Sequence, residues 1–109
     1  MNNKEVDYSK EVVLSLIPTG KGNAINQKKL VELTGYGSRD IRAIVQALRR
    51  DGNPICSNTC HGYWIAESVK ELDETIRQLT AQRMTIDDTI NCLVETSCRL
   101  EREVANGYE

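Results

Sequence analysis

The sequence contains no phenylalanine, one tryptophan and two prolines in 109 residues. Because aromatic rings are so few, a core has to be built mainly from leucine, isoleucine and valine. No run of eighteen apolar residues occurs, and the amino-terminal stretch MNNKEVDYSK has no apolar segment, so we expect neither a membrane span nor a secretory signal. A cytoplasmic protein whose four cysteines stay reduced is the resulting prediction.

Motifs that carry enzymatic chemistry are missing from the sequence as well. It has no phosphate-binding loop, no serine elbow and no paired carboxylates in a concave setting. Asp87 and Asp88 are about 100° apart on a predicted helix and are typical of solvated surface. Cys60 and His61 are adjacent on a predicted strand and would point to opposite faces, which argues against a catalytic pair. We therefore expect no enzyme and no cofactor.

A C-x3-C-H pattern at Cys56, Cys60 and His61 raises the alternative of a zinc site. Tetrahedral zinc needs four ligands, usually with a second pair at short spacing. Cys92 and Cys98 are six residues apart on a predicted helix and do not face a common ion. Buried or half-buried thiols on a hairpin are the favoured interpretation, so we expect no metal. A redox sensor built on Cys56 and Cys60 stays open, with nothing else to support it.

The net charge of −2 conceals an uneven distribution along the chain. Residues 1–66 hold nine Lys/Arg against six Asp/Glu, and residues 67–109 hold five against ten. Within residues 21–50 the balance is seven against two, or +5. This split predicts a module that faces a polyanion, followed by an acidic second element.

Three short amphipathic helices are expected in the first half of the chain. The first covers residues 8–17 and ends before Pro18. Its inward face is expected to carry Tyr8, Val12, Leu16 and Ile17. Ala24 and Ile25 are expected to form a very short strand after a loop.

The second and third helices have clear boundary signals. Asn26 is a good N-cap for a helix that begins at residue 27, and Gly35 is placed to end it. Ser38 is the expected cap of the third helix, and Gly52 closes that helix. The second helix should turn Leu30 and Leu33 inward. The third should turn Ile41, Ile44, Val45 and Leu48 inward, at the spacing i, i+3, i+4 and i+7.

A β-hairpin is predicted next, in the segment 55–66. Its two strand-like runs, ICS and GYWIA, flank Asn58 and Thr59 and are rich in β-compatible residues. Trp64 and Ile65 are expected to pack back on the domain.

The last segment, residues 69–104, contains neither proline nor glycine and fits a heptad repeat. With a at Val69 and d at Leu72, nine of the eleven a and d positions are apolar. A helix of this length would extend about 54 Å, too long to bury its stripe against a small domain, so we expect a second copy of the chain to cover it. The expected contacts are Leu72, Ile76, Leu79, Ile86, Ile90, Leu93 and Leu100.

Two questions about this helix stay open. Thr85 and Asp88 form a potential capping box, so the alternative is a helix that breaks there and folds into a hairpin. The residues at e and g do not indicate whether two copies pair in parallel or antiparallel.

This order of elements resembles the winged helix-turn-helix domain of bacterial and phage regulators, over residues 8–66. The helix-turn-helix would be LVELTGYGSRDIRAIVQALRRDG and the wing PICSNTCHGYWI. The long carboxy-terminal helix looks like the dimerisation helix of many such regulators. The resemblance implies a mainly α (α+β winged-helix) fold, with a three-helix core and hairpin wing in residues 1–66 and a dimerisation helix in residues 67–109. The wing is short and nearly uncharged, unlike wings that reach the minor groove through Arg or Lys.

In such domains the second helix of the helix-turn-helix lies in the major groove. Arg39 and Arg42 could each contact guanine, and Gln46 suits adenine. The other expected DNA contacts are Ala43, small enough for close approach, the outward-facing Arg49 and Arg50, and the phosphate-facing Lys28, Lys29, Tyr36 and Ser38. The alternative is that these charged residues only keep an exposed helix face hydrated and bind nothing.

The resulting functional prediction is sequence-specific binding of double-stranded DNA by a homodimeric transcriptional regulator. The alternative is a protein-interaction module of a replication or phage-assembly complex.

Overall fold

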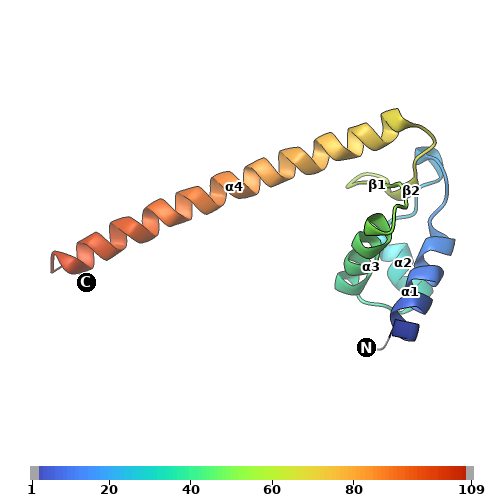
Figure 1. Ribbon diagram of the computed structural model, residues 1–109, viewed down its shortest axis with the longest axis horizontal. Helices are drawn as coiled ribbons and strands as arrows, with labels where there is room; N and C mark the ends of the chain where they lie inside the picture. Colours follow the sequence, from blue (N-terminus) through green and yellow to red (C-terminus); the bar gives the residue numbers. More distant parts are fainter. Residues whose placement is uncertain (1–2, 108–109) are drawn as a thin grey trace. The chain divides into compact units, whose positions relative to one another are not determined.

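The computed structural model describes the backbone of residues 3–107 and the side chains of residues 8–107. Its elements follow one another along the chain as shown in Figure 1. They are α1 (Asn3–Leu16), the 3-10 turn η1 (Lys21–Asn23), α2 (Gln27–Thr34), α3 (Ser38–Arg50), β1 (Ile55–Asn58), β2 (Gly62–Ile65) and α4 (Val69–Ala105). This confirms the predicted α+β fold with a hairpin and a long carboxy-terminal helix.

The chain divides into two compact units, Met1–Thr75 and Ile76–Glu109. The first unit therefore contains the first two turns of α4 in addition to the helices and the hairpin. Among the helices that the structure describes, none combines the length and hydrophobicity that a membrane crossing needs.

The core of the first unit is aliphatic, as the shortage of aromatic residues predicts. The hairpin adds Cys56 and Trp64, both buried. Ile65 packs against the helical cluster, as expected, whereas the buried Trp64 lies on the other face of the strand and donates to Glu71 at the start of α4. The cluster itself consists of Val13, Ile17, Leu30, Ile41, Val45, Leu48 and Ile55.

The inward face of α1 differs from the expected one. Ser9, Val13 and Ile17 are buried, whereas Tyr8 is 65% exposed. The prediction is confirmed for Ile17, which is buried, and for Leu16, which packs against the core, and it was wrong for Tyr8 and Val12. The hydroxyl of buried Ser9 donates to the Tyr36 hydroxyl at 3.4 Å. A polar residue can therefore occupy an inward position that the hydrophobic pattern assigned to its neighbour.

The inward prediction was also wrong for Leu33, which is 53% exposed. Helix α2 has only eight residues and buries Leu30 completely. Two turns present one narrow face to the core, and Leu33 lies outside it.

Helix boundaries follow the capping residues closely. The side chain of Asn26 accepts from the backbone N–H of Lys29 at 2.8 Å, and Gly35 adopts a φ of 77° with its N–H donating to Val31 O. At α3 the expected cap was wrong by one residue, because Gly37 has the extended conformation of an N-cap and Ser38 is already helical. No side chain caps that end.

The hairpin is antiparallel, with Ile55 opposite Ile65 and Cys56 opposite Trp64. The expected short strand at Ala24 and Ile25 exists as a single bridge, in which Ile25 and Tyr63 exchange backbone hydrogen bonds of 2.8 and 2.9 Å. The outer side of β2 is thereby tied to the segment that precedes α2.

The start of α4 is anchored to the hairpin. Glu71 is central, because its carboxylate accepts from the indole N–H of Trp64 at 3.2 Å and from the backbone N–H of Glu67 at 2.6 Å. The hydroxyl of Ser68 accepts from the backbone N–H of Glu71 at 3.3 Å. One turn later, buried Thr75 accepts from the backbone N–H of Ser57 at 3.4 Å. The first two turns of α4 are therefore part of the first unit.

The helix α4 then continues to Ala105 without a break. The alternative of a hairpin at Thr85 is thus wrong. The hydroxyl of Thr85 donates to Ala81 O at 3.1 Å, the i−4 bond of a threonine inside a helix, and does not act as a cap.

Candidate nucleic-acid interface

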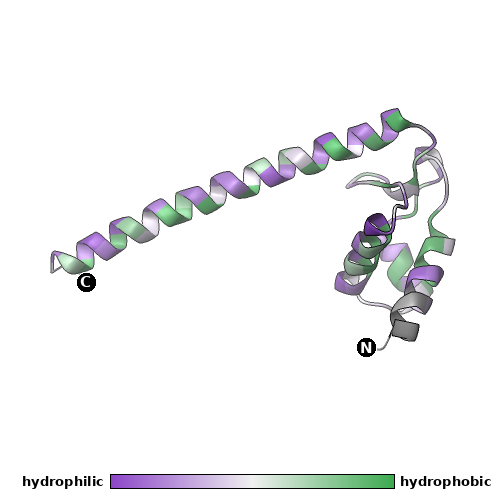
Figure 2. Cartoon of the chain, viewed as in Figure 1, coloured by the Kyte–Doolittle hydropathy of each residue, from purple (hydrophilic) through white to green (hydrophobic). Residues whose placement is uncertain are grey.

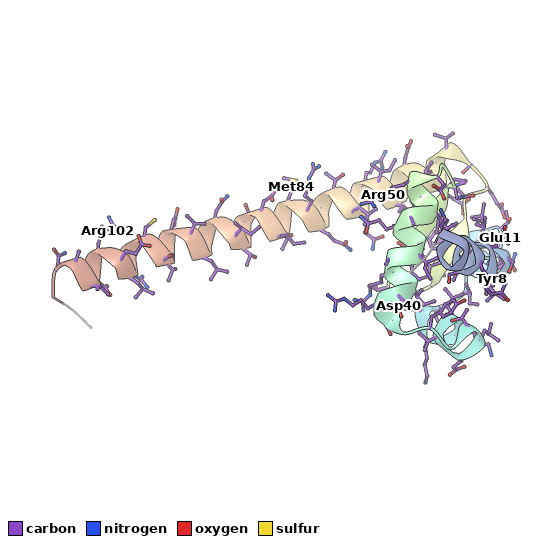
Figure 3. All side chains as sticks on the ribbon, turned by 60° about the horizontal axis from the view of Figure 1, so that its bottom comes forward. Tyr8, Glu11, Asp40, Arg50, Met84 and Arg102 are labelled. Atoms are coloured by element: carbon purple, nitrogen blue, oxygen red, sulfur yellow. The ribbon has the colours of Figure 1, made fainter. Side chains whose placement is uncertain are left out.

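Helix α3 has one buried face and one exposed face. Buried Ile41, Val45 and Leu48 point to the core. The exposed face is a stripe that spans an arc of about 100° at 3.6 residues per turn. Asp40 and Arg50 mark the two ends of the helix in Figure 3. We call the exposed face the α3 stripe; it consists of Arg39, Arg42, Ala43, Gln46 and Arg50.

The α3 stripe is basic, and its polar side chains are without partners among the described residues. Its four polar side chains make no hydrogen bond or ion pair within the part of the chain that the structure describes. Asp40 is exposed but lies about 60° outside the stripe, in the first turn, where a carboxylate favours the helix N-terminus. The stripe thus presents three guanidinium groups and one amide to solvent without a competing acid among them.

Arg49 behaves differently from the other arginines of α3. Its Nε donates to Ile55 O at 2.9 Å and its Nη2 donates to Ser57 Oγ at 3.0 Å. Burial lowers the pKa of Arg49 from its ordinary value, although nearby Tyr63 and Cys56 oppose that shift. The side chain joins the end of α3 to β1. Arg49 therefore has a structural contact and, unlike the arginines of the α3 stripe, does not point freely into solvent.

Two residues near the stripe were not expected from the sequence. Gln27 donates to Ser38 O at 3.3 Å and accepts from the Tyr63 hydroxyl at 3.3 Å, which links α2, the start of α3 and β2. Burial raises the pKa of Tyr63, while the charges of Arg49 and Arg42 lower it. No local pattern marks Gln27, because its partners are 11 and 36 residues away.

The expected phosphate-facing residues have unequal exposure. Lys28, Lys29 and Ser38 are exposed, the lysines on α2 and the serine at the first position of α3. Tyr36 is half-buried, and its hydroxyl accepts from Ser9 at 3.4 Å. The tyrosine therefore braces α1 against the turn between α2 and α3.

The tip of the hairpin carries little charge. Asn58 accepts from the backbone N–H of His61 at 2.6 Å, and the His61 ring meets Trp64 edge-on with 6.3 Å between centroids. Cys60 and His61 are exposed, whereas Cys56 is buried. In the described residues no three histidine, cysteine or acidic side chains gather as metal ligands would.

The predicted dimer-forming side chains lie mostly in solvent. Leu72, which belongs to the first unit, is half-buried, and the rest are between 42% and 64% exposed. Figure 2 shows hydrophobic residues recurring along the whole of α4. We call this face the α4 seam; its exposed apolar members at the expected positions are Ile76, Leu79, Ile86, Ile90, Leu93 and Leu100.

In comparisons with known proteins, no family model, no curated protein and no solved structure matches the chain.

Proposed function

We propose that the protein binds double-stranded DNA through α3 and acts as a homodimeric transcriptional regulator. The observation that carries this proposal is the α3 stripe. A face of three arginines and a glutamine, with no hydrogen-bond or ion-pair partner in residues 8–107, is suited to a polyanion that provides both phosphates and base edges.

The stripe has the chemistry for reading bases in the major groove. Arg39 and Arg42 are one turn apart, and a guanidinium can donate two hydrogen bonds to guanine O6 and N7. Gln46 can pair with adenine, while Ala43 between them allows the helix to approach closely. Lys28 and Lys29 at the start of α2 would contact phosphates and orient the domain.

The dimer is supported by the α4 seam. Exposed leucine and isoleucine side chains recur at heptad spacing from Ile76 to Leu100, and a stripe of this kind is stabilised in water when another surface covers it. A second copy of the same helix fits the repeat without further assumptions. Its two-fold symmetry predicts a DNA site with an inverted repeat.

The first test is fluorescence anisotropy with a labelled mixed-sequence duplex at about 50 and 200 mM salt. We expect micromolar non-specific binding that weakens steeply with salt. Once an operator is found by selection from a random pool, Arg39→Ala or Arg42→Ala should cost about 1–3 kcal/mol at one base position. The matched control is Arg99→Ala on α4, which removes the same charge from another exposed site. No binding at the lower salt would refute the proposal.

A second candidate function is a protein-interaction module in a larger complex. It is favoured by the net charge of −2 and by the nearly uncharged hairpin tip. Under this function the Arg39 and Arg42 variants leave nucleic-acid affinity unchanged, whereas substitutions at Ile86 or Ile90 abolish assembly with the partner.

A further inference from the structure

Two polar residues interrupt the α4 seam, and they restrict how it can pair. Arg83 and Ser97 both occupy a positions, and both are exposed in the single chain. A seam residue is surrounded by four residues of the facing helix, so each must meet a suitable environment there. For Arg83 a suitable environment contains a carboxylate.

A parallel, in-register pair does not provide that carboxylate. Each a residue faces its own counterpart, so Arg83 would lie against Arg83 of the partner subunit. The nearest flanking residue across the seam would be the partner's Gln82, which carries no charge. Two guanidinium groups would be brought together with nothing on the facing helix to neutralise them.

In an antiparallel pair an a residue lies level with a d residue of the facing helix and beside its e residue. When Arg83 lies level with the partner's Ile86, the adjacent e residue is Asp87 of the partner subunit. The two-fold axis then passes between residues 84 and 85, so the Arg83–Asp87 contact forms twice. If the helices slide by one heptad in either direction, Arg83 meets Val94 or Thr80 of the partner subunit instead.

The rest of the α4 seam is compatible with this register. Ile76 lies level with the partner's Leu93, and Leu79 with the partner's Ile90, so the apolar layers continue on both sides of the axis. In this register the acidic residues at e positions, Asp73, Asp87 and Glu101, do not face one another across the pair. In the neighbouring register, by contrast, Asp87 would face Asp87 of the partner subunit.

We propose that α4 pairs antiparallel with a second copy of this chain, with Arg83 beside Asp87 of the partner subunit at the centre. This inference rests on the homodimer of the proposed function and adds its direction and register. The proposed DNA-binding unit of each chain includes the amino-terminal end of its own α4, so the two units of the dimer are attached at opposite ends of the pair. The two Val69 residues are then about 46 Å apart along the helix axis.

The direction is tested with a spin label on Cys98 of the full chain. Cys60→Ser and Cys92→Ser remove the other exposed thiols, and buried Cys56 is left in place. Double electron–electron resonance should give about 40 Å between the two labels, because Cys98 lies level with residue 71 of the partner subunit. A distance below about 20 Å would indicate a parallel pair, and about 30 or 51 Å would indicate a register shifted by one heptad. Either result overturns this inference and leaves the homodimer intact, whereas a monomer with no dipolar signal overturns the homodimer as well.

The central contact is tested by charge exchange between chains. Arg83→Glu or Asp87→Arg alone should weaken the homodimer about ten-fold or more, because like charges then meet across the seam. Mixed together, the two variants should form a heterodimer in preference to either homodimer, since both cross-chain contacts become attractive. Residues 83 and 87 remain like-charged within each helix, so an intrahelical effect cannot produce this preference. Arg99→Glu, away from the seam, is the control, and statistical mixing of Arg83→Glu with Asp87→Arg would overturn the contact.

Discussion

Arg49 shows how a single tertiary contact changes the role of a residue. Arg49 is one of four arginines on α3, and the sequence pattern predicted that it contacts DNA. In the structure its guanidinium donates to Ile55 O and Ser57 Oγ, which lie across the turn that follows α3. The carbonyl of buried Ile55 needs a donor, and Arg49 provides one.

Arg49→Ala should therefore lower stability, and any loss of DNA binding should be secondary to that. We expect the free energy of unfolding to fall by about 1–3 kcal/mol, because a buried carbonyl loses its charged donor. Urea denaturation measures this. Arg50→Ala is the control, and this exposed neighbour should change stability by less than about 0.5 kcal/mol. An Arg49→Ala variant that keeps full stability but loses DNA affinity would show that Arg49 belongs to the proposed DNA-binding surface.

Tyr63 makes stability depend on pH in the alkaline range. Burial raises its pKa above the ordinary value of 10.0, so the folded state keeps the phenol proton after the unfolded state has released it. Its contribution to stability is complete below about pH 10 and declines as pH rises beyond that value. Urea midpoints between about pH 9 and 11 should fall less steeply in Tyr63→Phe than in the wild type. Equal slopes would show that Tyr63 titrates in the same way in both states.

The hairpin depends on one glycine that allows a close backbone approach. Gly62 begins β2 with a φ of 99°, and a Cβ built on it would overlap the backbone of Ile25 and Asn26. Gly62→Ala should therefore destabilise the fold by about 2–4 kcal/mol, from backbone strain together with displacement of the Ile25–Tyr63 bridge.

Thermal and urea unfolding of Gly62→Ala measure this cost. Gly22→Ala is the matched control, since a Cβ there meets nothing within 4 Å and the residue has no positive φ. Equal stability of the two variants would mean that the segment before α2 does not lie against β2.

Helices were easier to predict from sequence than the faces they bury. Asn26, Gly35 and Gly52 mark ends of α2 and α3 through chemistry within a few residues. The inward face of α1 was predicted correctly at Leu16 and Ile17 but missed Ser9 and Val13, and the partner of Ser9 is Tyr36, 27 residues later. Helix α4 is continuous, in agreement with its heptad pattern and its lack of proline and glycine. The potential capping box at Thr85 does not interrupt it.

The two units of the chain have different tasks in the proposed function. The first unit has ten Lys/Arg and ten Asp/Glu and carries the basic α3 stripe. The second unit has four Lys/Arg against six Asp/Glu and carries the apolar α4 seam. Two linked DNA-binding units gain affinity from their connection, about 10²–10⁴-fold when both can engage the same duplex.

Ile90→Asp should separate these two tasks. It places a carboxylate in the α4 seam, so we expect a monomer in sedimentation equilibrium. Affinity for an inverted repeat should fall by about 10²-fold or more, while affinity for a single half-site stays unchanged. Asn91→Asp adds the same charge one residue away, outside the seam, and should leave both quantities unaltered. If the half-site affinity also collapsed, the DNA-binding unit would depend on dimerisation for its fold.

Local patterns in the chain were sufficient for the order of helices and hairpin, the capping residues at α2 and the aliphatic core, and they favoured a long α4 without excluding a break at Thr85. These features depend on neighbours within a few residues or on a regular repeat, so short-range chemistry specifies them. The roles of Arg49, Gln27, Ser9 and Gly62 depended on the packed fold, because each is defined by a partner brought close only when distant segments pack together. The α3 stripe depends on both local pattern and tertiary packing. Regular spacing places its residues on one face of the helix. In the packed fold Arg49 binds the backbone of Ile55, whereas Arg39, Arg42, Gln46 and Arg50 stay exposed.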